Sequence, residues 1–131
     1  MDYDMINTDR RLNFFTYVRA TLIKNKFYSE PVINDICGNI GLNNHEIVDF
    51  SHNGEDCTGV QVKSDDPAVK RKDYDYIYSM ISSAFIRVFR YNYPILMSMF
   101  TEGELQKILN GDNTLLFQVI LTGDDSLQII F

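Results

Sequence analysis

The chain has 131 residues, 45% of them hydrophobic and 23% charged, so it is expected to fold as one globular domain over residues 1–131 without long disordered tails. Eighteen acidic against twelve basic residues give a formal net charge of −6, and such a field repels phosphate backbones and anionic lipid headgroups. We therefore expect no nucleic acid and no membrane as partner, and a basic protein is favoured.

Targeting signals and cysteines are sparse. The N-terminal residues Met1-Asp2-Tyr3-Asp4 precede no apolar run, and Arg87 and Arg90 interrupt the most apolar region, which predicts neither a signal peptide nor a membrane span. Cys37 and Cys57 allow at most one disulfide, which is no framework for a secreted scaffold. We expect two small buried side chains in a reducing compartment, the cytoplasm.

Two helices are predicted in the first third of the chain. Thr8 is a suitable cap for a helix over Asp9–Lys26, whose apolar residues recur at spacings of three and four. Those residues are Leu12, Phe15, Val18 and Leu22. The run Ser29-Glu30-Pro31 marks a second start, because proline is tolerated in the first turn, and Gly41 is expected to end this helix in a left-handed cap.

The pattern changes to period two between Glu46 and Lys63. Apolar and polar residues alternate there on both sides of Asn53-Gly54, a pair that tolerates the positive φ angles of a tight turn. The segment is predicted to be a β-hairpin with one solvated face.

The longest amphipathic pattern runs from Pro67 to Tyr93. It begins at Pro67 or nearer Asp73, because Lys70–Lys72 lie unfavourably at the positive end of a helix dipole. Its apolar stripe predicts the main face of the core. The stripe consists of Ile77, Met80, Ile81, Ala84, Phe85, Val88 and Phe89.

A further helix and a second hairpin complete the chain. Pro94 should end or bend the long helix, and Ile95–Phe100 should form a short apolar turn or helix. Thr101 and Glu104 have the spacing of a capping box, for a helix closed by Gly111. Leu115–Leu121 is apolar on both sides, which predicts a central strand paired with Leu127–Phe131 across the turn Gly123-Asp124-Asp125.

The predicted fold is therefore a single compact α+β domain in the order ααββααββ, with two β-hairpins packed with the long amphipathic helix. The two ααββ halves suggest an internal duplication, but their residues are not similar. Whether the two hairpins share one sheet is left open.

No catalytic or metal-binding motif is specific. Structural zinc takes closely spaced ligand pairs, whereas Cys37, His45, His52 and Cys57 are eight, seven and five positions apart. A Cys–His nucleophile pair needs only spatial proximity, but no nucleophile turn surrounds Cys57, and Ser82-Ser83 lie in the middle of a helix. We expect no metal, no cofactor and no enzymatic activity.

Acidic pairs and tyrosines are the candidate partner-binding residues. Acidic pairs at turns suit cation sites, but they act more often as caps and solvated tips, which here would present a negative face. Tyr74 and Tyr78 lie four residues apart off the apolar stripe, and tyrosine is enriched at interface hot spots. The predicted partner-binding set is Tyr74, Tyr78, Asp65, Asp66, Glu55, Asp56, Asp124 and Asp125.

Three functional hypotheses follow. The first is a non-enzymatic immunity-type inhibitor that neutralises a basic toxin or nuclease domain by occluding its active site. The second is a small acidic chaperone or adaptor that dimerises through the long helix, and the third is a small hydrolase. The basic residues Lys70–Lys72, Arg87 and Arg90 resemble a nucleic-acid surface in composition alone, and on an acidic protein such a cluster is more often an intramolecular ion-pair partner or a solvated helix start.

Overall fold

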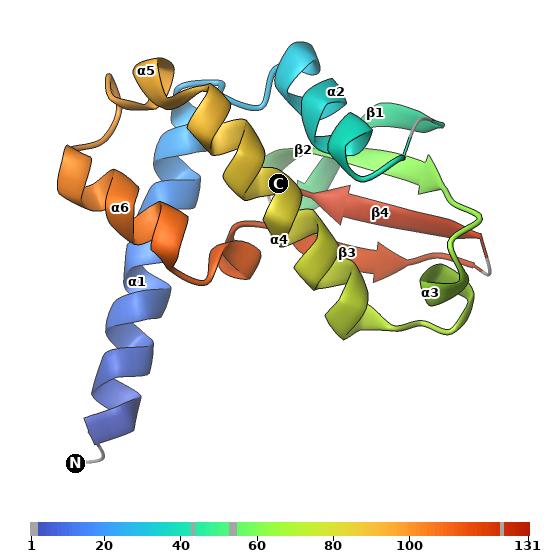
Figure 1. Cartoon of the computed structure of the whole chain (residues 1–131), viewed down its shortest axis with the longest axis horizontal. Helices are drawn as coiled ribbons and strands as arrows, with labels where there is room; N and C mark the ends of the chain where they lie inside the picture. Colours follow the sequence, from blue (N-terminus) through green and yellow to red (C-terminus); the bar gives the residue numbers. More distant parts are fainter. Residues whose placement is uncertain (1–2, 43, 53–54, 124) are drawn as a thin grey trace.

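A single antiparallel sheet joins both hairpins. The computed structural model describes residues 3–42, 44–52, 55–123 and 125–131. Within these ranges four strands lie in the order β1-β2-β4-β3, which confirms the α+β class and places β2 and β4, from different hairpins, at the centre (Figure 1). The strands are β1 (His45–His52), β2 (Glu55–Lys63), β3 (Gln118–Leu121) and β4 (Ser126–Ile130). The predicted turn residues Asn53, Gly54 and Asp124 lie outside the described residues.

The prediction of a central strand over Leu115–Leu121 is wrong. Asn113–Leu116 form a 3₁₀ turn, η1, and β3 begins only at Gln118, at the edge of the sheet. β4 is the inner strand of this hairpin, because it pairs with both β2 and β3. Leu116 and Phe117 are buried at a turn that contacts α1 and α4, not between two neighbouring strands.

The first helix, α1 (Tyr3–Lys24), starts earlier than predicted. The chain is already helical at Thr8, so a cap at that residue is wrong, because threonine is also tolerated inside a helix. The helix ends two residues before the predicted Lys26, which has a left-handed φ of 55° and redirects the chain. Phe15, Val18 and Leu22 are buried as predicted, whereas Leu12 is exposed.

The second helix, α2 (Glu30–Asn39), has the predicted start, with Pro31 in its first turn. Gly41 has a φ of 71°, which confirms the left-handed glycine after the helix. The inner side of α2 is formed by Val32, Ile33, Ile36 and Cys37, all of them buried.

The Pro67–Tyr93 segment is two helices. A short α3 (Pro67–Lys70) precedes the long α4 (Tyr74–Tyr91), and Lys72, with a φ of 56°, separates them. Each helix has an aspartate cap: Asp66 accepts a hydrogen bond from the Ala68 amide, and Asp73 accepts one from the Tyr76 amide. The alternative start near Asp73 is thus confirmed, and the break leaves Lys70–Lys72 outside α4.

Two shorter helices follow, α5 (Tyr93–Leu96) and α6 (Glu102–Asn110). The predicted capping box is confirmed, since the Glu104 amide donates to the Thr101 hydroxyl and the Thr101 amide donates to the Glu104 carboxylate. The hydrogen bond from the Thr101 amide lowers the pKa of the Glu104 carboxyl. Gly111 follows as the C-cap.

The core lies between α4 and the sheet, with Phe85 at its centre. Helix α4 crosses the face of the sheet (Figure 1), and its predicted stripe is buried except for Met80, which is half-buried. The Phe85 ring stacks on Phe117 at 4.9 Å between centroids and lies 5.9 Å from the ring of Phe131. The same ring contacts Phe89 and Tyr28 edge-on, so four segments of the chain meet at this one residue.

Two glycines around α6 are a matched pair for testing the packing of α1 against α6. A Cβ at Gly111 would lie 2.5 Å from the Lys107 carbonyl oxygen and 2.8 Å from the Phe15 ring, whereas a Cβ at Gly103 would meet nothing within 4 Å. We expect Gly111→Ala to lower the free energy of unfolding by about 1–3 kcal/mol through overpacking. Gly103→Ala is expected to raise it by about 0.5 kcal/mol through helix propensity. Urea denaturation measures both, and equal effects would contradict the packing described here.

Candidate functional site

The two predicted contact tyrosines cover the edge of strand β3. The Val119 amide donates to the Tyr78 hydroxyl at 2.8 Å, and the Leu121 amide donates to the Tyr74 hydroxyl at 3.4 Å. In the β3–β4 register, with the Thr122 amide bonded to Ser126, Val119 and Leu121 are the residues whose main-chain groups point away from β4. Both phenol hydroxyls therefore accept hydrogen bonds from amides that have no partner within the sheet.

The two spacings match. Four residues of helix advance about 6 Å, and two residues of strand advance about 6.7 Å. Tyr74 and Tyr78 thus meet alternate residues of β3, with α4 running antiparallel to the strand. Tyr78 is half-buried and stacks on Phe117 at 5.2 Å, while Tyr74 keeps 41% of its surface exposed. The structure gives both tyrosines a role within the fold, and Tyr74 retains surface for a partner.

The acidic pairs lie at two separate ends of the sheet. The Ser64 amide donates to the Asp125 carbonyl oxygen, so the Asp65-Asp66 corner and the Asp125 turn are adjacent. Glu55 and Asp56 begin β2, whereas the corner follows the end of that strand at Lys63, about 26 Å away at about 3.3 Å per residue. The structure therefore brings the corner and the Asp125 turn together and leaves Glu55-Asp56 at the far end.

Charge is divided between two parts of the chain. The segment 30–66, which contains α2, β1 and β2, has Lys63 as its only lysine or arginine. Its eight acids are Glu30, Asp35, Glu46, Asp49, Glu55, Asp56, Asp65 and Asp66. Residues 10–29 of α1 and the following turn carry five bases and no acid. We call segment 30–66 the acidic segment, and it accounts for the negative balance of the whole chain.

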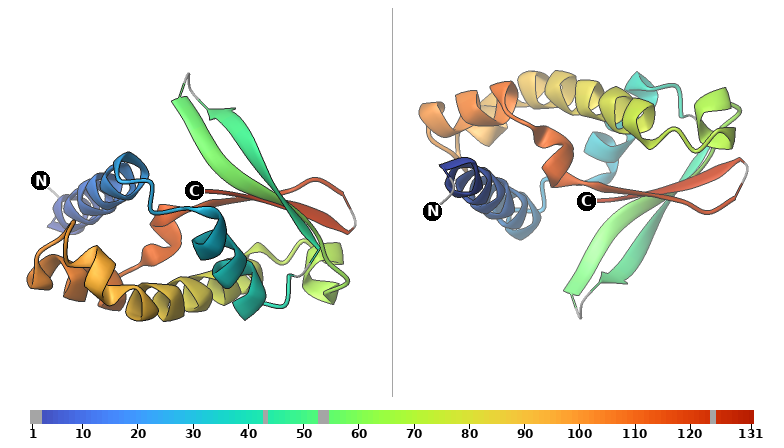
Figure 2. Two further views of the ribbon diagram at one scale, coloured as in Figure 1. Left: turned by 90° about the horizontal axis from the view of Figure 1, so that it is seen from above. Right: turned by 90° about the horizontal axis from the view of Figure 1, so that it is seen from below.

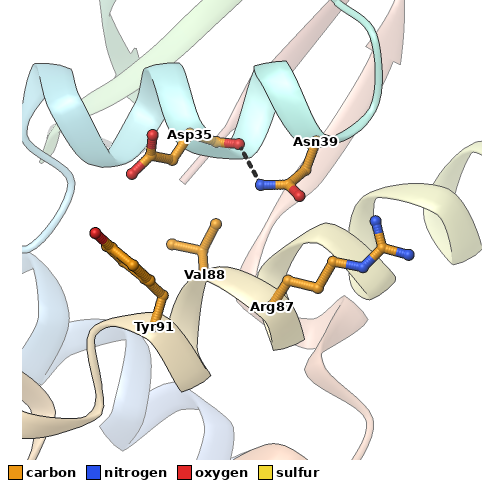
Figure 3. Close-up of a pocket in the computed structure, with 5 residues that line it drawn as sticks. All are labelled: Asp35, Asn39, Arg87, Val88 and Tyr91. Atoms are coloured by element: carbon orange, nitrogen blue, oxygen red, sulfur yellow. Dashed lines mark hydrogen bonds between the residues drawn. The ribbon is translucent and has the colours of Figure 1, made fainter.

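A cavity of about 300 Å³ opens between α2 and α4, beside the acidic segment (Figure 3). It is lined by Asp35, Asn39, Arg87, Val88 and Tyr91. A second cavity of about 250 Å³ shares Asn39 and Arg87 and continues along α4 to Tyr76. The two cavities adjoin at these shared residues, and we call them together the α2–α4 groove.

The α2–α4 groove has the chemistry of a protein contact surface. Two large aromatic side chains of the groove are open to solvent, since Tyr91 is 82% exposed and Tyr76 is 51% exposed. In Figure 3 the Asp35 carboxylate and the Tyr91 ring lie at one end of the first cavity and the Arg87 guanidinium lies at the other. Among the described residues, neither of these two charged groups is in an ion pair. They are available to a charged partner.

Sequence reasoning missed this groove. The sequence marks Arg87 as one of several basic residues and gives no reason to group it with Asp35, Asn39 and Tyr91. The available signal was the i,i+4 spacing of Asp35 with Asn39 and of Arg87 with Tyr91, which places each pair on one helix face. The missing information was that these two faces lie side by side.

The candidate nucleophiles and ligands are held in structural contacts. The His45 imidazole is hydrogen-bonded to the Leu42 carbonyl oxygen and to Asn34 Oδ1, at 3.0 and 2.8 Å. Cys37 and Cys57 are buried thiols, as predicted, and the Arg19 guanidinium donates to Cys57 Sγ. Ser82 is hydrogen-bonded to the buried Asn113 amide group, so it links α4 to η1. The side chain of His52 lies outside the described residues.

No described cluster of three or more His, Cys, Asp or Glu residues could hold a metal ion. No helix within the described ranges is long and apolar enough to cross a membrane. No family model matches the chain, and no curated protein or solved structure matches it either.

Replacing the two phenols tests the covering of the β3 edge. We expect Tyr78→Phe to lower the free energy of unfolding by about 1 kcal/mol, because the buried Val119 amide loses its acceptor. Tyr74→Phe should cost less, because its hydrogen bond is longer and lies at the surface. Urea denaturation gives the energies, and hydrogen exchange should show faster exchange of the Val119 amide in Tyr78→Phe only. Unchanged exchange at Val119 would contradict the assignment.

The buried Cys37 thiol predicts a loss of stability at alkaline pH. Burial raises its pKa to about 11 from an ordinary value near 9. Between these values only the unfolded chain ionises, so this contribution is complete below pH 9 and is lost as the pH rises toward 11. Burial also raises the pKa of Tyr28, which acts in the same direction above pH 10.

The measurement is the free energy of unfolding at half-unit steps of pH. Between pH 9 and 10, Cys37→Ala should show a shallower decline than the unsubstituted protein, whatever its absolute stability, because Tyr28 contributes equally to both proteins. Identical slopes would show that the Cys37 thiol is not desolvated in the folded state.

Proposed function

We propose that the protein is a non-enzymatic, immunity-type inhibitor that binds a basic toxin or nuclease domain and occludes its active site. The observation that carries the proposal is the α2–α4 groove, where exposed Tyr76 and Tyr91 adjoin the acidic segment. Rigid aromatic anchors beside unpaired charges are the composition of protein-binding hot spots.

The charge division supports a basic partner. Eight acids against one lysine over residues 30–66 give α2, β1 and β2 a strong negative balance, which favours encounter with a cationic surface. A basic active-site cleft that binds a phosphate backbone presents such a surface, and acidic side chains placed over it would compete with the substrate.

The apolar stripe of α4 does not favour the chaperone alternative. Ile77, Ile81 and Phe85 are at most 1% exposed, because the stripe is consumed by the core of this chain. A dimer seam along α4 would have to use its polar face. The hydrolase alternative is not favoured either, because the His45 imidazole is hydrogen-bonded to Leu42 and Asn34 and the Cys37 thiol is buried.

The test is to capture a partner from the native host on the immobilised chain and to measure its affinity. The immobilised chain should retain a basic protein at low salt, and binding should weaken at least tenfold between about 50 and 500 mM salt. The captured protein should lose its own activity at a one-to-one ratio. An acidic or neutral target, or affinity independent of salt, would overturn the proposal.

Substitutions in the groove test which surface is used. Tyr91→Ala should weaken binding by about 2 kcal/mol, because it removes an exposed aromatic anchor. Asp35→Asn should weaken binding less and reduce its salt dependence. Glu102→Gln is the matched control, because Glu102 is an exposed acid on α6 outside the acidic segment and should leave the affinity unchanged. Equal affinities for all three variants would exclude the groove.

A further inference from the structure

The two edges of the sheet are treated differently by the fold. At β3, two phenols of α4 cover the outward amides. At β1, the hydrogen bonds to β2 begin at Asn44, whose carbonyl oxygen accepts from the Lys63 amide. In this register the bonded residues of β1 alternate from Asn44, so His45, Ile47, Asp49 and Ser51 point their main-chain amides and carbonyls away from β2.

No described group of the chain covers the outward amides of Ile47 and Asp49. Figure 2 shows the β1–β2 hairpin projecting away from α4, so no helix lies along its outer part. β1 is eight residues long, and Ile47 exposes 36% of its surface beside the open edge. An uncovered strand of this length is a template for an added strand.

We propose that the outer edge of β1 binds an extended lysine- or arginine-bearing segment of the basic partner, which joins the sheet next to β1. This inference rests on the proposed function and gives it a binding mode. Main-chain hydrogen bonds to β1 provide affinity, and side chains of alternate residues provide specificity.

Charge complementarity identifies the occupant. β1 carries exposed Glu46 and Asp49, and it lies within the acidic segment, so cationic side chains on an added strand face carboxylates on both sides of the sheet. In a second copy of this chain, the strand that pairs with β1 would belong to another acidic segment, with eight acids and one lysine. Repulsion between these segments disfavours pairing of β1 with itself.

A synthetic peptide is the probe. We expect an end-capped eight-residue peptide of alternating lysine and valine to bind at low salt, and the matched peptide with glutamate in place of lysine to bind at least tenfold more weakly. Hydrogen exchange should slow at the Ile47 and Asp49 amides when the lysine peptide is added. Binding without this protection would overturn the strand addition.

Two substitutions at one position distinguish the contribution of the main-chain amide to peptide binding from that of the side chain. Ile47→Pro removes an amide that does not bond to β2, so the hairpin should survive, as proline is tolerated on edge strands. It should weaken peptide binding at least tenfold, whereas Ile47→Ala, which keeps the amide, should stay within threefold. Equal binding by Ile47→Pro would overturn the inference. If Ile47→Pro does not fold, the exchange measurement on the unsubstituted protein decides.

The outcomes distinguish this inference from the proposed function. If Ile47→Pro leaves the affinity for the captured basic protein unchanged while Tyr91→Ala weakens it, the edge proposal is wrong and the inhibitor proposal stands. If sedimentation shows a dimer that Ile47→Pro dissociates, a second copy occupies the edge and the proposal is wrong. If no basic protein is captured but the lysine peptide still protects Ile47, the edge binds cationic strands without the proposed inhibitory role.

Discussion

The docking of α4 against the sheet is the constraint on which the rest of the molecule depends. Phe85 inserts its ring among Phe117, Phe131, Phe89 and Tyr28, which brings the 3₁₀ turn, the chain end and the turn after α1 to one point. The same helix places two phenols at the edge of β3. One element thus contributes the main apolar face and also protects the strand beside it.

This arrangement determines which residues remain for a partner. The tyrosines on the β3 side of α4 are engaged by main-chain amides, whereas Tyr76 and Tyr91 face the α2–α4 groove and stay exposed. Because α2 begins the acidic segment, the groove lies where aromatic surface and negative charge adjoin. The short left-handed break at Lys72 matters here too, since it keeps the basic run outside the long helix.

The sheet has one protected edge and one open edge, and both follow from where α4 lies. A helix long enough to follow β3 leaves β1 without cover, because the two strands are at opposite edges of the sheet. An open edge is an aggregation hazard unless charge guards it, and the exposed carboxylates of Glu46 and Asp49 provide that protection against copies of the same chain. The same charges favour a cationic strand.

Local sequence signals are sufficient to predict most of the individual elements. The run Ser29-Glu30-Pro31 and Gly41 predict the start and the end of α2. The period of three to four residues predicts the inner face of α4, and the Thr101–Glu104 spacing predicts the capping box, because each signal depends on neighbours within a few residues. The early start of α1 was not predicted, because a helix can begin without a preferred capping residue.

Long-range packing determines the strand order, the edge position of β3, the roles of Tyr74 and Tyr78 and the groove between α2 and α4. Each of these depends on which faces meet across tens of residues of chain. The apolar pattern of Leu115–Leu121 is the same whether strands or helices bury it, and the spacing of two tyrosines is the same whether a partner or strand β3 receives their hydroxyls. A sequence pattern predicts that a side chain is buried, but the residues that bury it depend on the tertiary packing.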